Sequence, residues 1–230
     1  MSRPDLLEHF RGDAAGRALV FQTLEHLGFS PKEHLEQLAQ LLGTCLFLTG
    51  RLQGLTDTTL SDAGEQAARS WRLPPPADGW RRFSSPLKRA RRTAELLQPS
   101  VPVSVDSRLR EMSFGAWEGY TLADLRKTVG HSFAAAEALG LDFQPPGGES
   151  PRATMARIGG WTAEVARSGE PVVAISHKAA IRALVALATG WDMTGRPPVK
   201  LDWRALHLFM AYGDGRVEVG RLNVPLAGGP

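Results

Sequence analysis

The sequence contains a single cysteine, Cys45, in a chain of 230 residues. One thiol cannot form an internal disulfide, and it cannot supply a cysteine-rich metal site. Cys45 lies within an apolar run, so we interpret it as a buried, inert residue. We therefore expect a protein of a reducing compartment without a cysteine-rich metal site.

Long apolar runs are also absent. No stretch approaches the roughly 18 residues needed to span a bilayer, and residues 1–13 contain no continuous apolar segment of the kind found in signal peptides. The sequence therefore predicts a cytoplasmic protein that does not associate with membranes.

An excess of charge of one sign is lacking as well. The 27 lysines and arginines nearly balance the 24 aspartates and glutamates, giving a formal net charge of +3. Such a small excess argues against a surface dedicated to nucleic acid. It is compatible with a small anionic substrate.

The chain is long enough for one substantial α/β core, and its first part differs in character from the rest. Residues 1–43 contain few β-branched residues and three segments with helical periodicity, Asp5–Phe10, Ala14–Leu27 and Pro31–Leu42. We predict that residues 1–43 form a helical appendage to an α/β domain of residues 44–230. The appendage packs on that domain or binds a protein partner, and a homodimer is also compatible with the sequence.

The α/β domain is predicted to begin with a central strand at residues 44–49. Ser61 is expected to cap a helix, and Ser85 with Pro86 to open another. Residues 101–105 are typical of an edge strand, because a proline cannot donate to a ladder. Two final strands join through Gly213-Asp-Gly215 as a hairpin.

Residues 112–150 interrupt this order of strands and helices. Their aromatic residues, glycines and short helical segments predict a lid-like insertion that folds over a site.

The chain is organised around residues 172–190, which are typical of a buried strand, a sharp turn and a helix that stops at Gly190. His177 lies in the turn. The carboxyl end of a strand and the N-terminus of the following helix form a common anion-binding place. We therefore predict that His177 lines an anion site, the alternative being a loop histidine without a role.

Two further side chains fit an anion site. Arg89 lies in the first turn of the helix predicted after Ser85 and off its apolar stripe, where a guanidinium can bind phosphate bidentately. Glu111 supplies a carboxylate in an aromatic, glycine-rich loop, and Glu118 is the competing acid there.

Four segments together resemble the histidine phosphatase superfamily, the phosphoglycerate-mutase-like proteins, over about residues 44–226. They are Gly50-Arg-Leu-Gln-Gly54, Ser84–Ala94, Leu109–Gly119 and Ser176–Arg182. The resemblance implies a three-layer α/β sandwich with a mostly parallel central sheet, without metal or cofactor. It also implies hydrolysis or transfer of phosphomonoesters of small molecules.

The resemblance assigns roles to individual residues. Arg89 would clamp the phosphate, Glu111 would protonate the leaving oxygen, and His177 would hold the phosphoryl group. Arg51, Gln53 and Gly54 would line the substrate pocket.

One part of the family pattern has no counterpart. Members of the family carry Arg-His-Gly at the end of the first strand, followed by a loop with a threonine and an asparagine. Here Leu46-Phe-Leu-Thr49 passes directly into Gly50. The nucleophilic histidine is missing from its place, which favours a pseudo-phosphatase that binds phosphate with lost or much reduced turnover. The alternatives are an active phosphatase that uses a histidine from elsewhere, His9 above all, and an interaction module built on the N-terminal helices.

Overall fold

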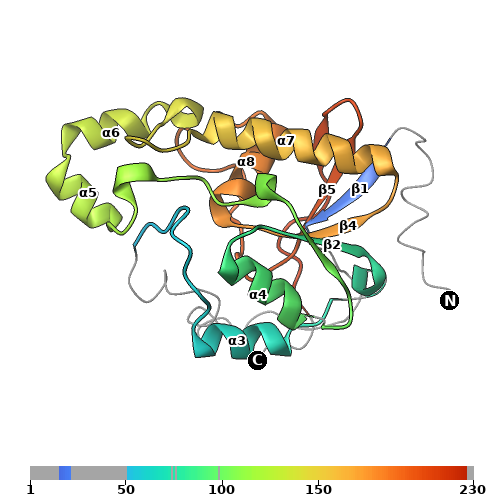
Figure 1. The fold of residues 1–230 in the computed structure, drawn as a ribbon. Helices are drawn as coiled ribbons and strands as arrows, with labels where there is room; N and C mark the ends of the chain where they lie inside the picture. The colour runs from blue at the N-terminus through green and yellow to red at the C-terminus, as the bar shows by residue number, and fades with distance from the viewer. Residues whose placement is uncertain (1–15, 22–50, 74, 76, 98, 227–230) are drawn as a thin grey trace.

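The computed structural model describes residues 16–21, 51–73, 75, 77–97 and 99–226. They form a three-layer α/β fold, as predicted, with a six-stranded sheet between two layers of helices (Figure 1). Helices α7 (Pro151–Ser168) and α8 (Lys178–Thr189) cover one face of the sheet. Helices α3 (Asp62–Ser70) and α4 (Lys88–Leu97) cover the other.

The strand order is β3-β2-β4-β1-β5-β6. Four neighbouring strands, β3, β2, β4 and β1, run parallel; β5 pairs antiparallel with β1, and β6 pairs antiparallel with β5. The strands are β1 (Gly16–Phe21), β2 (Arg81–Ser84), β3 (Val103–Val105), β4 (Val172–Ile175), β5 (His207–Tyr212) and β6 (Val217–Val219). The sheet is therefore mostly parallel, as the sequence predicts.

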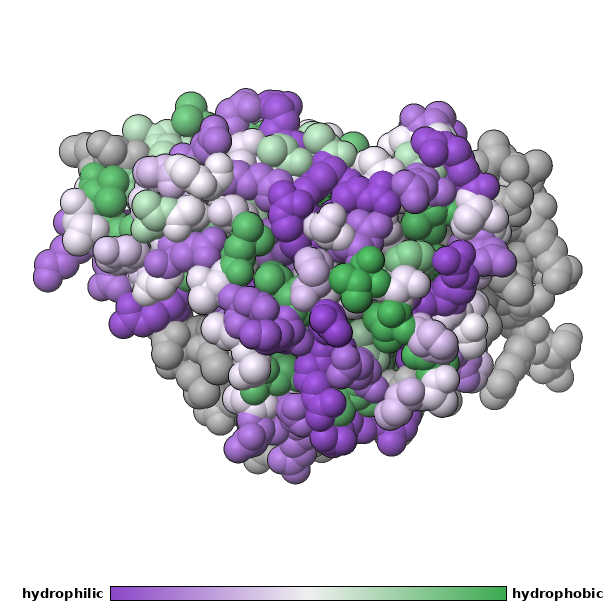
Figure 2. All heavy atoms as spheres, in the orientation of Figure 1, coloured by the Kyte–Doolittle hydropathy of each residue, from purple (hydrophilic) through white to green (hydrophobic). Residues whose placement is uncertain are grey.

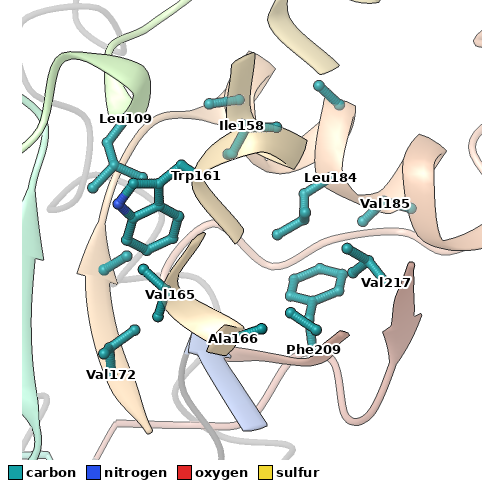
Figure 3. Close-up of a cluster of buried hydrophobic side chains, with 14 of the residues drawn as sticks. Leu109, Ile158, Trp161, Val165, Ala166, Val172, Leu184, Val185, Phe209 and Val217 are labelled. Atoms are coloured by element: carbon teal, nitrogen blue, oxygen red, sulfur yellow. The ribbon is translucent and has the colours of Figure 1, made fainter. Parts of the chain in front are cut away.

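Strand β4 is buried on both faces, which explains its uninterrupted apolar sequence. Val172 and Ala174 pack in the core beneath α7 and α8, whereas Val173 packs in the core beneath α3 and α4. Trp161 of α7 is 1% exposed and lies in the larger core beside Leu109 (Figure 3). This core fixes the carboxyl end of β4, from which the chain enters the turn at His177.

Strand β1 corrects the helix predicted over Ala14–Leu27. Residues 16–21 pair in parallel with β4 and antiparallel with β5, so they form a central strand. The apolar run Ala18–Phe21 is too short for its periodicity to separate helix from strand, and pairing decides its structure. These six residues therefore belong to the sheet and not to a helical appendage. The rest of residues 1–43, and the strand predicted at residues 44–49, lie outside the described residues.

Several other predicted elements are confirmed. Ser61 caps α3 by accepting a hydrogen bond from the Gly64 backbone N–H at 3.2 Å. Strand β3 is an edge strand, and β5 and β6 form the hairpin. The predicted start of α4 is wrong by two residues: the helix begins at Lys88, so Ser85 and Pro86 precede it and are not its N-cap and first residue. The backbone N–H of Lys88 donates to the Asp57 carboxylate at 2.7 Å.

The insertion at residues 112–150 has a small core of its own. Trp117, Leu125 and Phe133 are buried together, with ring centroids of Trp117 and Phe133 5.2 Å apart. It contains α5 (Leu122–Thr128), α6 (His131–Glu137) and the 3-10 turns Gly115–Trp117 and Gly140–Asp142. Two other 3-10 turns, Ala77–Gly79 and Ser107–Leu109, lie outside it. Figure 1 shows α5 and α6 extending beyond one end of α7.

Within the described ranges, no helix is long and apolar enough to cross a membrane. On the face of the molecule in Figure 2, hydrophobic residues are scattered among hydrophilic ones and form no single large patch.

His207 opens β5 and is buried, at 2% exposure. Its Nδ1 accepts a hydrogen bond from the Asn223 backbone N–H at 3.2 Å, while Nε2 has no partner among the described residues. His207 is therefore hydrogen-bonded through one ring nitrogen only within the described part of the chain.

Burial makes His207 a source of acid sensitivity. It lowers the pKa of this imidazole to about 4, from a reference value of 6.5. The unfolded chain therefore takes up a proton at higher pH than the folded chain, and stability falls as the pH drops from about 6.5 to 4. Wild-type protein is therefore expected to lose free energy of unfolding between pH 7 and pH 4, and His207→Asn should reduce this loss by roughly 3 kcal/mol. Urea unfolding at the two pH values measures the difference. An unchanged difference between the two pH values would contradict this prediction.

Candidate active site

The candidate site lies at the carboxyl ends of β2 and β4, where the chain turns into α4 and α8. The Ser85 backbone N–H donates to the Ile175 carbonyl at 2.9 Å, which joins the two strand ends. His177 is the N-cap residue of α8, and its Nε2 lies 2.7 Å from the Ser85 hydroxyl. The predicted place of His177, at the mouth of the sheet and the start of a helix, is confirmed.

His177 is held as a neutral imidazole. Burial, together with the positive charges of Arg89 and Arg157, lowers its pKa well below the usual value. A neutral ring presents one N–H donor and one lone pair. The Ser85 hydroxyl is the hydrogen-bond partner of Nε2.

Arg89 is buried in the first turn of α4, at 5% exposure. Its guanidinium donates to the Thr56 and Gly54 carbonyls, both at 2.9 Å. A guanidinium has five N–H donors, and among the described residues these two carbonyls are its acceptors. Its three other N–H donors have no hydrogen-bond acceptor among the described residues.

Glu111 reaches the N-terminus of α8. One carboxylate oxygen accepts from the backbone N–H groups of Met112 at 2.9 Å and Ala179 at 3.1 Å. Burial raises the pKa of this carboxyl, although those hydrogen bonds and the charge of Arg89 oppose the shift. A carboxyl with a raised pKa retains its proton to higher pH and can act as a general acid.

An ion pair holds the backbone beneath Glu111. Arg157 of α7 binds the Glu149 carboxylate through two hydrogen bonds of 2.8 and 2.9 Å. It also donates to the carbonyls of Arg108 at 2.6 Å and Glu111 at 3.2 Å. Burial opposes ionisation of Glu149, yet Arg157 holds the pKa of its carboxyl below the usual value.

Glu118, the competing acid, has a structural role. Its carboxylate accepts from the backbone N–H groups of Leu55, Thr56 and Phe114 and from the Thr56 hydroxyl, at 2.7 to 3.1 Å. The carboxyl passes so close to Gly54, which has a φ of +53°, that a Cβ at this position would collide with it. Glu118 therefore ties the Gly54 loop to the insertion and is saturated with donors.

A cavity of about 710 Å³ adjoins Glu111, between α8 and the insertion; we call it the insertion cavity. The three predicted pocket residues, Arg51, Gln53 and Gly54, all line it. Arg51 is exposed and donates to the Gly119 carbonyl at 2.7 Å. The amide oxygen of Gln53 is buried without a partner in the described part of the chain.

Four of the predicted site residues, Arg51, Gln53, Gly54 and Glu111, line the insertion cavity, whereas Arg89 and His177 are not part of its lining. Arg89 is joined to this group through the Gly54 carbonyl.

The structure also adds three residues to which the sequence assigned no role in the site. The first is Ser85, which the sequence predicts only as the start of a helix and whose hydroxyl contacts His177. Lys178 and Arg182 also line the insertion cavity. Their spacing of four residues on one helix was visible in the sequence, but the cavity wall that they face was not.

The charges in the site suit an oxyanion. Arg89 offers spare donors, α8 directs its N-terminus at the site, and Glu111 places an acid beside it. Among the residues that the structure describes, no group of three His, Cys, Asp or Glu side chains could hold a metal ion.

The chain is similar to several curated phosphatases and mutases. It is 32% identical over 178 residues to a 2,3-bisphosphoglycerate-dependent phosphoglycerate mutase of Methylobacterium, covering 72% of this chain and 85% of the relative. It is 34% identical over 168 residues to a glucosyl-3-phosphoglycerate phosphatase of Mycolicibacterium vanbaalenii, covering 64% of this chain and 70% of the relative.

Solved structures share the fold. A mycobacterial hydrolase superposes with a TM-score of 0.68 at 25% identity, covering 91% of this chain and 99% of the other. A mycobacterial glucosyl-3-phosphoglycerate phosphatase complexed with VO3 superposes with a TM-score of 0.64 at 26% identity, covering 90% of this chain and 99% of the other.

The family model of the histidine phosphatase superfamily (branch 1) matches residues 44–225. That range includes the strand ends, the Arg89 helix, the Glu111 loop and the His177 turn described above. The chain therefore belongs to the histidine phosphatase superfamily.

Proposed function

We propose that this chain binds a small cytoplasmic phosphomonoester at Arg89 and His177 and turns it over slowly or not at all. The observation that supports binding most strongly is the buried guanidinium of Arg89, which uses two of its five donors on protein carbonyls. A mycobacterial relative of this fold, 28% identical, has been solved with inorganic phosphate.

In this proposal each residue has a separate task. Arg89 neutralises the phosphoryl oxygens, and the free ring nitrogen of His177 contacts one of them. Glu111, whose pKa is raised by burial, lies beside the ester oxygen as a proton donor. Phosphoryl transfer needs charge stabilisation and an acid at the leaving group, and these residues provide both.

Slow turnover follows from the missing nucleophile. The sequence passes from Leu46-Phe-Leu-Thr49 into Gly50 without the Arg-His-Gly of the family. His177 does not replace it in this proposal, because its Nε2 is engaged by Ser85. Covalent transfer through a phosphohistidine then lacks its attacking nitrogen.

Strand β1 supports an alternative, an active phosphatase with a relocated histidine. β1 runs parallel to β4, so its last residue, Phe21, ends at the sheet edge where His177 lies. His26 follows five residues later in the sequence, and His9 and His34 are the other candidates from the first 43 residues.

Two measurements test the proposal. Inorganic phosphate or vanadate at a hundred times its Kd is expected to raise the melting temperature by roughly 5–10 °C. Turnover of p-nitrophenyl phosphate is expected to stay below about 1 per second, the lower end for working enzymes. Protection without turnover supports the phosphate-binding reading. Absence of protection contradicts it.

Single variants test the alternative, an active phosphatase with a relocated histidine. If turnover exceeds the expected limit, His9→Ala, His26→Ala and His34→Ala are assayed beside His177→Ala. Loss of turnover in one N-terminal variant, with phosphate protection retained, identifies a relocated nucleophile and overturns the inactive reading.

A further inference from the structure

Large apolar side chains on the wall of the insertion cavity keep part of their surface exposed. Leu52, Phe114, Phe143 and Met193 are partly buried, and Leu122 is 42% exposed. They come from three separate parts of the chain, namely the segment before the Gly54 loop, the insertion and the loop after α8. Contact between apolar surface and water is unfavourable, so a ligand that covers these side chains gains binding free energy.

Packing within the protein does not account for all of this surface. The small core of the insertion is formed by Trp117, Leu125 and Phe133. Leu122 opens α5, but it belongs to none of the hydrophobic clusters in the described part of the chain. Met193 packs only in part against the larger core. The cavity wall therefore carries more apolar surface than the cores of the protein use.

Charged side chains on the same wall already contact protein groups. Arg51 donates to a backbone carbonyl of the insertion at 2.7 Å, and Glu137 pairs with Arg126 at 3.4 Å. The Arg182 guanidinium lies 5.2 Å from the centroid of the Trp191 ring. These contacts orient the polar groups toward protein partners.

A polyol would find few partners in this cavity. The amide oxygen of Gln53 has no partner among the described residues, but it is enclosed by protein, so a ligand hydroxyl does not reach it in this arrangement. The Lys178 ammonium lies 5.5 Å from the centroid of the Trp203 ring. Hydroxyl groups that enter the cavity would lose hydration without full replacement of their hydrogen bonds.

Glu111 connects this cavity with the proposed phosphate pocket. Its carboxylate lines the cavity, and its negative charge favours the ionised form of Arg89. Gly54 also lines the cavity, and its carbonyl accepts a hydrogen bond from Arg89 at 2.9 Å. A phosphomonoester that is bound at Arg89, with its ester oxygen beside Glu111, therefore extends its alcohol portion into the insertion cavity.

We propose that the insertion cavity selects phosphomonoesters whose alcohol portion is a compact apolar group, above all an aromatic ring, over those of polyols. This inference rests on the proposed function and names its substrate class. A volume of about 710 Å³ lies within the range of ligand pockets, about 300–1,000 Å³. Phe114 and Phe143 offer ring faces and edges against which an aromatic group can pack.

Two phosphonates test the proposal. Phenethylphosphonate and dihydroxybutylphosphonate replace the ester oxygen of benzyl phosphate and of glycerol phosphate by a methylene group. Because a phosphonate has no ester bond to this carbon, its titration measures binding whatever the turnover. We expect the wild-type protein to bind the phenethyl compound at least about tenfold more tightly by isothermal titration calorimetry. Its heat-capacity change of binding should also be the more negative of the two.

Cavity variants locate the ring. Leu122→Ser and Met193→Asn are each expected to lower the affinity ratio at least about threefold. Met193 has a φ of +62°, which asparagine adopts more readily than methionine, so this substitution does not strain the backbone. Leu139→Ser is the matched control, because Leu139 is 57% exposed in the same insertion and is not part of the cavity wall. Its ratio should stay within about twofold of wild type.

The outcomes distinguish this inference from the proposed function. If inorganic phosphate binds but the polyol compound binds as tightly as the phenethyl compound, the apolar preference is refuted and the phosphate pocket stands. The same conclusion follows if both cavity variants keep the wild-type ratio, if Leu139→Ser lowers it equally, or if excess phosphate fails to displace the phenethyl compound. If phosphate itself does not bind, the proposed function fails as well. Should one cavity variant not fold, the other decides.

Discussion

Inorganic phosphate is expected to bind the Arg89→Met variant at least about a hundredfold more weakly than the wild-type protein. Each charge-assisted hydrogen bond contributes about 1.5–3 kcal/mol, and the buried guanidinium has three donors beyond those used by Gly54 and Thr56. Methionine fills similar space and offers no donor. Calorimetric titration with phosphate at pH 7 measures the change.

The matched control for this prediction is Arg91→Met, two residues away on the same helix. Arg91 is exposed, so its replacement removes the same formal charge from the solvated face of α4. We expect its phosphate affinity to stay within about twofold of wild type. Equal weakening in both variants would mean that Arg89 acts through net charge and not as a phosphate ligand.

The Arg157→Met variant is expected to lose about 3–5 kcal/mol of its free energy of unfolding. Arg157 and Glu149 are 10% and 12% exposed, and the substitution leaves the buried Glu149 carboxylate with Arg110, at 3.2 Å, as its remaining ion-pair partner among the described residues. The carbonyls of Arg108 and Glu111 lose a donor too. Urea unfolding at neutral pH measures the loss.

Arg152→Met is the control on the same helix. Arg152 pairs with Asp142 at 2.7 Å, but these side chains are 55% and 61% exposed, so we expect a change below about 1 kcal/mol. Arg157→Met combined with Glu149→Gln should recover part of the loss, since no uncompensated charge then remains. A cost for Arg157→Met no greater than for Arg152→Met would show that the buried pair contributes little.

Local patterns predicted the part of the site that depends on single segments. The apolar run before His177 and the helical stripe after it specify a strand, a turn and a helix, and these place the imidazole at the sheet edge. Arg89 could be found in the same way, because its helix leaves a strand directly. For both residues the information lies within about a dozen neighbouring positions.

What the sequence could not show depends on contacts between distant segments. The helix predicted over Ala14–Leu27 is a strand at residues 16–21 because its partners lie in β4 and β5, more than 150 residues away. Arg157 carried no signal as the support of Glu111, since an arginine on a long helix is usually solvated. The contrast between Glu111 and Glu118 likewise arises only when the insertion folds against the Gly54 loop.

The position of β1 affects how the chain can fold during synthesis. β1 leaves the ribosome first, yet its antiparallel neighbour β5 ends at Tyr212, near the end of the sequence. Until that neighbour emerges, one edge of the growing sheet has unpaired backbone groups, and such edges are prone to intermolecular pairing. Premature termination before β5 would therefore yield an aggregation-prone fragment and not a smaller working domain.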